Sequence, residues 1–192
     1  MPKRIPKYLL SVAKCPKIIK AKHGSSKTTL QVGAIKAELE VAASGSSELS
    51  LDATAAKGVA LEASGSSETT LSVAETDKFT LATSGSSQVT VKGLQAKSVA
   101  STNSGSSELS LAGKGADSAV YEVSGSSEST ADKLPTAEVT VEAAGSSQLL
   151  VNVSDKLSGS ARGSSEVLYT GSVPDAAVDV DTTGSASVKR KN

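Results

Sequence analysis

Residues 44–51 read Ser-Gly-Ser-Ser-Glu-Leu-Ser-Leu, and the same eight residues return at 104–111. The centre of this stretch, Gly-Ser-Ser, recurs in steps of 21, then 20 five times, then 18 residues, and a degenerate Gly-Ser-Ala copy follows 21 residues later. A fixed period of this kind is typical of a stacked solenoid, whereas a flexible linker has no reason to keep one. The motif begins at Gly24, Gly45, Gly65, Gly85, Gly105, Gly125, Gly145 and Gly163, and the degenerate copy begins at Gly184.

Apolar and polar residues alternate within each repeat, in two short runs that are rich in β-branched residues. Period-2 alternation is typical of strands with one buried and one solvated face. Two strands and two corners in about 20 residues predict an all-β, single-domain parallel β-helix, or solenoid, of eight to nine coils, with neighbouring coils about 4.8 Å apart. In one repeat the predicted inward residues are Ser47, Leu49 and Leu51, followed by Val59, Leu61 and Ala63.

The Gly-Ser-Ser motif is expected to form one corner of each coil. Glycine fits a corner because it adopts a positive φ without a steric penalty. Serine hydroxyls at such a corner can bond to neighbouring backbone groups. Parity places the second serine of each motif inward, as a polar ladder, and a solvent-facing ladder is the alternative. The ladder consists of Ser47, Ser67, Ser87, Ser107, Ser127 and Ser147.

Composition and charge limit the function classes. The 192 residues include 35 Ser, 16 Gly, one Phe, three Tyr and no Trp, so the coil interior must be narrow and filled by Leu, Val and Ala. Acidic and basic residues balance at 20 each, which predicts no nucleic-acid partner. Residues 1–37 nevertheless carry nine Lys or Arg and no acid, whereas 38–188 carry eight bases and 20 acids. We divide the single domain 1–192 into a basic N-terminal coil or cap (1–23), the repeats (24–183) and a C-terminal end with a basic tail (184–192).

The N-terminal segment does not match a secretory signal. Its apolar run, 8–13, is ended by Lys14 and is too short for the hydrophobic region of a signal peptide. No run approaches the length of about 20 apolar residues that a membrane span needs. The sequence therefore predicts no signal peptide and no membrane span in this chain, which leaves a truncated chain or a cytoplasmic protein as alternatives to export.

Two outward columns follow from the register of the repeats. The first is mainly carboxylate and the second is mainly hydroxyl. Stacked like charges repel each other, and the glutamines in the first column are expected to dilute that repulsion. The first column is Lys27, Glu48, Glu68, Gln88, Glu108, Glu128, Gln148 and Glu166, and the second is Thr29, Ser50, Thr70, Thr90, Ser110 and Thr130, followed by Leu150 and Leu168.

The repeated stretch at 44–51 and 104–111 resembles the Ser-Gly-Ser-Gly-Asp-Ile/Val-x-Leu signature of the GIN-domain family of auto-transporter adhesin heads. The passage 163–174, Gly-Ser-Ser-Glu-Val-Leu-Tyr-Thr-Gly-Ser-Val-Pro, is similar to the closing coils of that family. Ser replaces the second motif Gly at Ser47 and its equivalents. The resemblance implies a right-handed parallel β-helix, a cell-envelope or extracellular setting, and no established catalytic residues.

Few residues in the chain can carry catalysis or hold a metal. A hydrolase triad needs a histidine beside a carboxylate, and the only histidine, His23, precedes the first motif. One cysteine, Cys15, and one histidine cannot supply the three or four ligands of a zinc site. We therefore expect no enzyme activity, no metal and no cofactor.

The sequence favours a structural or adhesin-like surface module that presents repeated polar columns on a rigid solenoid. The partner is left open, with a cell-surface protein or a glycan as candidates, and copies could also associate through the solenoid ends. The alternatives are a carbohydrate-binding or polysaccharide-processing β-helix, and a scaffold without a ligand, including a designed one.

Overall fold

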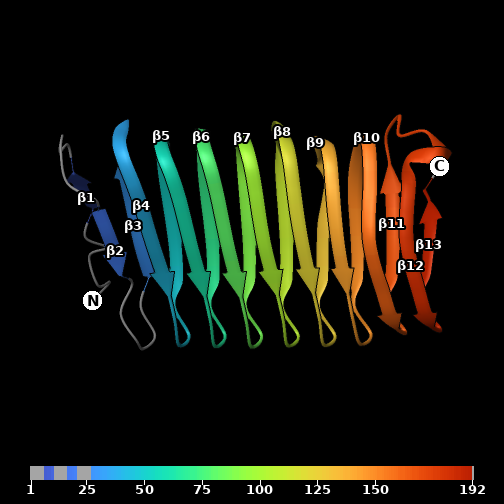
Figure 1. Cartoon of the computed structure of the whole chain (residues 1–192). Helices are drawn as coiled ribbons and strands as arrows, with labels where there is room; N and C mark the ends of the chain where they lie inside the picture. Colours follow the sequence, from blue (N-terminus) through green and yellow to red (C-terminus); the bar gives the residue numbers. More distant parts are fainter. Residues whose placement is uncertain (1–6, 11–16, 21–26, 192) are drawn as a thin grey trace.

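The structure is a computed structural model that describes the backbone of residues 7–10 and 17–20 and the chain from 27 to 191. It forms one parallel sheet of 13 strands that winds into a solenoid of about eight turns (Figure 1), so the predicted all-β solenoid is confirmed. The strands are β1 (Lys7–Leu10), β2 (Lys17–Lys20), β3 (Lys27–Val32), β4 (Ile35–Ala43), β5 (Glu48–Ala63), β6 (Glu68–Thr83), β7 (Gln88–Asn103), β8 (Glu108–Val123), β9 (Glu128–Ala143), β10 (Gln148–Gly163), β11 (Glu166–Thr170), β12 (Val178–Gly184) and β13 (Ser187–Arg190), with a 3-10 helix at Asp175–Ala177.

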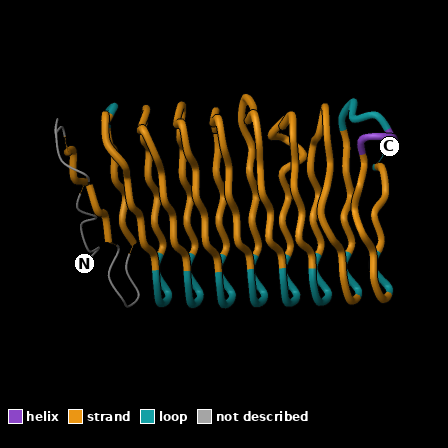
Figure 2. The backbone as a smooth tube through the Cα atoms, viewed as in Figure 1, coloured by secondary structure: helices purple, strands orange, loops and turns teal. Residues whose placement is uncertain are grey.

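Each central coil consists of one 16-residue strand, which corrects the prediction of two short strands per repeat. The Gly-Ser-Ser corners form a row of loops along one edge of the solenoid, whereas from β5 to β10 the chain passes through the opposite edge as continuous strand (Figure 2). At this second corner the alternation changes, because Ala53, Ala56 and Val59 are buried at intervals of three residues. Gly and Pro occur there irregularly, as at Gly93, Gly115 and Pro135, and not at one position in every coil, so the sequence gives little sign of how the strand bends.

Successive coils stack in a register of 20 residues, which places like residues on like. Leu51 of β5 pairs with Leu71 of β6, and Leu61 pairs with Leu81. All the inward residues predicted from parity in β5 are buried. The core is therefore a set of aliphatic columns, and among the described residues its largest fully buried side chains are Tyr121 and Phe79.

The glycine of each corner occupies a position that other residues fill only with strain. Gly105 has a φ of +83°, and a Cβ atom built on it would lie 2.6 Å from the carbonyl oxygen of Gly85. The corner also continues the inter-coil hydrogen bonding, since the Ser106 N–H donates to the Gly85 carbonyl oxygen at 2.8 Å. Gly24 lies outside the described residues. The φ values of the others are +78° at Gly45, +79° at Gly65, +78° at Gly85, +77° at Gly125, +80° at Gly145, +77° at Gly163 and +78° at Gly184.

The second serine of each motif lies inward, as parity predicts, and is buried. In most motifs its hydroxyl closes the corner by donating to the backbone carbonyl three residues earlier: Ser107 Oγ donates to Ser104 O at 2.8 Å and Ser87 Oγ donates to Ser84 O at 2.9 Å. Ser67 is the exception, because its buried Oγ has no hydrogen-bond partner. A buried hydroxyl without such an acceptor would cost stability. The serine is thus a structural part of the turn.

The C-terminal coil is held together by Arg190. Its guanidinium donates to the carbonyl oxygens of Val173 at 2.6 Å and Gly171 at 3.4 Å, and forms an ion pair with Asp175 at 2.8 Å. The same group lies 5.3 Å from the ring centroid of Tyr169, within cation–π range. Arg190 therefore fixes the segment that links β11 to β12.

Candidate functional site

The first outward column is a line of exposed or half-buried carboxylates and amides along one face, and we call it the acidic column. Its members pair directly across the ladders, as Glu48 with Glu68 and Glu108 with Glu128. It begins at Lys27, whose ammonium contacts Glu48, and it reaches Glu166, whose carboxylate lies 3.3 Å from the ammonium of Lys189. Neighbouring positions are about 4.8 Å apart, the spacing of strands in a sheet.

The glutamines of the acidic column donate to the carboxylates beside them. Gln88 Nε2 donates to Glu108 at 3.2 Å and Gln148 Nε2 donates to Glu166 at 3.0 Å. The bond from Gln148, followed by the bond and charge of Lys189, lowers the pKa of Glu166, although slight desolvation opposes the shift. The amides therefore separate pairs of carboxylates, and Gln148 stabilises the charged form of Glu166. The pairs Glu48–Glu68 and Glu108–Glu128 keep adjacent negative charges.

The hydroxyl column runs beside the acidic column, two residues further along each strand. Its members Thr29, Ser50, Thr70, Thr90, Ser110 and Thr130 are all partly exposed. The column then changes to Leu150, which is buried at 8% exposure, and to Leu168, in register. Together the two columns form a polar surface that extends across six coils, with Lys27 at its first step and a carboxylate or amide beside a hydroxyl at each of the next five.

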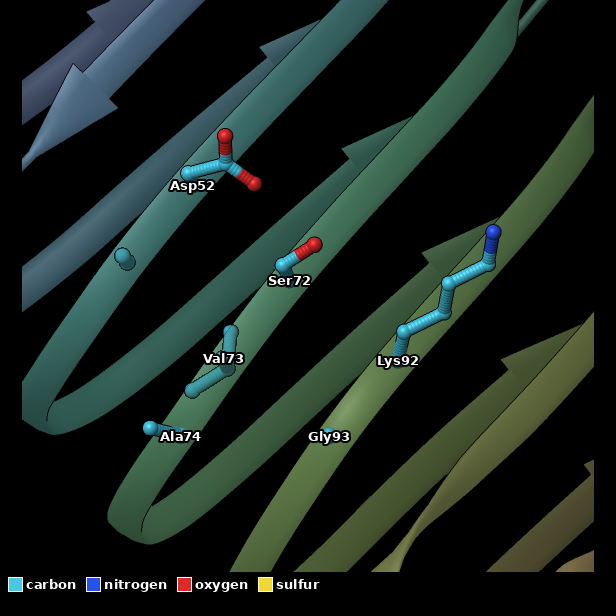
Figure 3. Close-up of a pocket in the computed structure, with 7 residues that line it drawn as sticks. Asp52, Ser72, Val73, Ala74, Lys92 and Gly93 are labelled. Atoms are coloured by element: carbon cyan, nitrogen blue, oxygen red, sulfur yellow. The ribbon is translucent and has the colours of Figure 1, made fainter.

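A shallow hollow of about 200 Å³ interrupts this face between β5 and β7. Asp52, Ser72 and Lys92 stand on three successive strands around it, with Gly93 below Lys92 (Figure 3). Gly93, at a φ of +74°, displaces the inward position by one residue, so that Leu94 is buried in place of residue 93. The hollow thus results from a local bulge, and it places one acid, one hydroxyl and one base in a row.

A second hollow, of about 410 Å³, lies at the second corner of β6 to β9. Lys97 forms an ion pair with Asp77 at 2.7 Å, and this contact lowers the pKa of Asp77 and raises that of Lys97. Both side chains are well exposed, so the pair contributes little to stability. The backbones of β8 and β9 also approach each other closely here, since a Cβ atom on Gly115 would lie 2.9 Å from the carbonyl oxygen of Pro135.

A buried polar cluster interrupts the aliphatic core near the Gly-Ser-Ser corners. Asn103 is fully buried, and its amide donates to Ser129 Oγ at 2.8 Å and to the Glu128 carbonyl oxygen at 3.1 Å. Its Oδ1 accepts hydrogen bonds from the hydroxyls of Thr83 and Ser107. Sequence reasoning missed this cluster, although the occurrence of Thr83 and Asn103 in an inward column of Ala and Val was a usable signal.

The residues weighed for catalysis are not brought together in the described part of the chain. Cys15 and His23 lie outside it. Within it, no group of three or more His, Cys, Asp or Glu is arranged to hold a metal ion. The Oγ atoms of the inward serines at Ser47, Ser87, Ser107, Ser127, Ser147 and Ser165 donate to backbone carbonyls.

Comparison with known families agrees with the repeat, the glycine corner and the closing coil. Residues 59–173, more than half of the chain, match the family described as "Putative auto-transporter adhesin, head GIN domain". The chain belongs to the GIN-domain family. The resemblance seen in the Gly-Ser-Ser repeats is therefore confirmed, and the GIN domain includes the coils that carry most of the acidic column. In the part of this GIN-domain chain that the structure describes, no helix is long and apolar enough to span a bilayer.

Curated relatives match the GIN-domain chain only over a short segment. N-acetyl-D-glucosamine kinases of Vibrio atlanticus (strain LGP32) and Vibrio parahaemolyticus are each 96% identical over 26 residues, which is 14% of this chain and 9% of the kinase. The kinase of Vibrio cholerae is 85% identical over the same length. The chain thus spans about 9% of the length of the curated relatives that it matches, and 26 residues are little more than one coil. No solved structure matches the chain.

Proposed function

We propose that this GIN-domain chain is a non-catalytic, adhesin-like surface module, exported to the cell envelope, that binds its partner through repeated polar columns on a rigid rod. The observation that carries the proposal is the in-register stacking of the acidic and hydroxyl columns over successive coils. A single carboxylate or hydroxyl on a flat surface binds weakly. Many identical groups in a line act together, because the first contact raises the effective concentration of the next.

The backbone supports the rigidity that the proposal needs. Every Gly-Ser-Ser corner from Gly65 to Gly163 is hydrogen-bonded to the corner before it, with N···O distances of 2.8 to 3.0 Å. The columns therefore keep a constant spacing between coils. A partner with its own repeated groups can match that spacing, whereas a small molecule would contact only one or two steps.

The test is a binding assay on the immobilised chain with three soluble polymers: a linear polycation, a linear polyanion and a neutral polysaccharide. We expect the polycation to bind, with an affinity that increases with polymer length. Glu68→Gln, Glu108→Gln and Glu128→Gln are each expected to weaken binding several-fold, and the triple variant is expected to abolish it. The matched control replaces Glu62, Glu122 and Glu142, three exposed carboxylates on the opposite face, and should bind nearly as the wild type does.

Two results would contradict the proposal. If one substitution alone removed all binding, a single pocket would be responsible and not the column. If incubation with the polysaccharide released new reducing ends, the chain would be an enzyme on a β-helix.

A further inference from the structure

One column of residues at the second corner carries charges of alternating sign. Along the edge opposite the Gly-Ser-Ser loops (Figure 2), Lys57, Asp77, Lys97 and Asp117 occupy the same position on four successive strands, β5 to β8. All four residues are exposed. Neighbouring members are about 4.8 Å apart, the spacing of strands in a sheet. This alternating column therefore differs from the acidic column, in which carboxylates of like charge stand side by side.

Contacts within the chain pair the two middle members of the alternating column but leave its ends unpaired. Lys97 forms the ion pair with Asp77 at 2.7 Å. The hydrogen bond and charge of Lys97, and after them the charge of Lys57, lower the pKa of Asp77 against the opposing effect of desolvation. Within the described part of the chain, Lys57 and Asp117 form no ion pair of their own. One unpaired lysine and one unpaired aspartate thus lie three coils apart, about 14 Å along the rod.

We propose that two copies of this chain pair edge to edge through the alternating column, with their rods antiparallel and a two-fold axis between Asp77 and Lys97. This inference does not rest on the proposed function. The axis places Lys57 of each copy opposite Asp117 of the other, and Asp77 opposite Lys97. Because both copies have the same distance between coils, all four positions face the opposite charge at once. Complementary charges of this kind fix the register of an interface.

The order of the charges selects this arrangement over parallel pairing. In a parallel pair in register, each residue would face its own counterpart, and like charges would repel each other. A parallel pair staggered by one coil would form three attractive pairs in place of four, and it would not be symmetric. A two-fold interface is the common form of a dimer of identical chains. The antiparallel pair is therefore the arrangement that uses every charge of the column.

The neighbouring columns agree with the same axis over the four central coils. Glu75 and Gln95 stand on successive strands in the next column. The axis places Glu75 of each copy opposite Gln95 of the other, so that the amide can donate to the carboxylate, as Gln88 does in the acidic column. In the coils on either side, Glu38 comes opposite Glu138. The attraction is therefore confined to β5–β8.

The hollow of about 410 Å³ at the second corner gives the longest of these side chains a place to lie. Asp117 lines it, and Gly115 contributes no side chain to its wall. In the antiparallel pair, Lys57 of the second copy lies opposite Asp117 and can extend its aliphatic stem into the hollow. The exposed lysine of one copy and the hollow of the other are thus complementary in shape as well as in charge.

A contact on one narrow edge predicts a weak, reversible dimer. The two-fold contact uses the alternating columns of both copies, so association stops at two chains. Salt weakens it, because the Debye length falls to about 3 Å at 1 M and exposed charges are then screened. The acidic columns lie next to the Gly-Ser-Ser edges and stay exposed. The dimer would therefore present two acidic columns that run in opposite directions.

Sedimentation velocity of the full chain tests the dimer. We expect the weight-average mass to rise with concentration from the monomer value of 19.2 kDa toward twice that value at low salt, and to return to it at 1 M salt. Lys57→Glu and Asp117→Lys should each keep the chain monomeric. The matched control is Glu122→Lys, which makes the same charge change as Asp117→Lys on the same strand but on the face opposite the acidic column, and it should dimerise as the wild type does. A wild type that stays at 19.2 kDa at every concentration, or a control as monomeric as Asp117→Lys, overturns the proposal.

Mixing the two single variants tests the antiparallel register. In a mixed pair, the new glutamate of Lys57→Glu faces the new lysine of Asp117→Lys, and the other three positions keep their complementary charges. We therefore expect the mixture to form dimers although each variant alone is monomeric. If the wild type dimerises and the mixture stays monomeric, the register is wrong.

A zero-length carbodiimide cross-linker, which joins an amine to a carboxylate in contact with it, identifies the facing residues. A link between Lys97 and Asp77 forms within the monomer as well and is the internal control. A link between Lys57 and Asp117 must join two copies, because the two residues are about 14 Å apart within one chain. Mass spectrometry of the digested bands should find this link in the dimer and not in the monomer. A dimer band that lacks it refutes the arrangement.

Discussion

Gly105→Ala perturbs the corner that sets the period of the solenoid. The substitution adds a methyl group at a φ of +83°, which costs about 1–2 kcal/mol for an L-residue. The new Cβ also lies 2.6 Å from the Gly85 carbonyl oxygen, a backbone atom held in the inter-coil ladder. Overpacking of this kind costs typically about 1–3 kcal/mol more. We therefore expect the free energy of unfolding to fall by about 2–5 kcal/mol.

Substitutions at two other glycines separate the cost of the positive φ from the cost of the close contact between coils. Gly93 has a φ of +74°, but an added Cβ meets only the Val73 carbonyl oxygen at 3.5 Å, so Gly93→Ala should cost the dihedral penalty of about 1–2 kcal/mol alone. Gly33 has no atom within 4 Å of an added Cβ, and Gly33→Ala should be nearly neutral. The measurement is the urea midpoint followed by far-ultraviolet circular dichroism. If Gly105→Ala costs no more than Gly93→Ala, the close approach between coils is not limiting.

Asn103→Val should lower the free energy of unfolding by about 1–3 kcal/mol in urea titrations, because the Thr83 hydroxyl loses its acceptor inside the core. Adding Thr83→Val should recover part of that loss, and a strictly additive double variant would argue against the cluster. Gln148 and Lys189 lower the pKa of Glu166 in the folded chain. The charged carboxylate of Glu166 therefore stabilises the folded chain above its ordinary pKa of 4.5, and this stabilisation is lost as the pH falls through the lower folded pKa. Glu166→Gln should therefore flatten the decline of the urea midpoint as the pH falls below 4.5, and an unchanged decline would contradict the assignment.

The long faces of the coil could be read from the sequence because burial there has a strict period of two. Leu49, Leu51, Leu61 and Ala63 are buried as parity requires, and the inward direction of Ser47 follows from the same rule. The two outward columns follow from it as well. One alternating pattern and one repeat length therefore fix the fold and most of the candidate surface.

The second corner could not be read in this way, because its burial depends on how the strand bends. Thr76 and Thr136 are buried there and donate to Lys78 O and Leu134 O at 3.0 Å, but nothing in their local sequence marks them as inward. The inward direction of Thr76 and Thr136 therefore depends on the bend of the strand, although the repeat places both in one column. Arg190, by contrast, lies beside Tyr169 because the two residues are ladder partners 21 residues apart, the same step that separates Gly163 from Gly184.

The two edges of the solenoid differ in how much change they can accept. The Gly-Ser-Ser corners stay stacked from coil to coil even though the spacing between them is 18 residues from Gly145 to Gly163 and 21 from Gly163 to Gly184. The differences in length are taken up at the opposite edge, where the β9–β10 ladder shifts register near Asn152 and Lys156 and where the 3-10 helix at Asp175–Ala177 lies. The glycine edge therefore acts as a fixed spine, and the opposite edge is where loops of new sequence can be inserted without disturbing the stack.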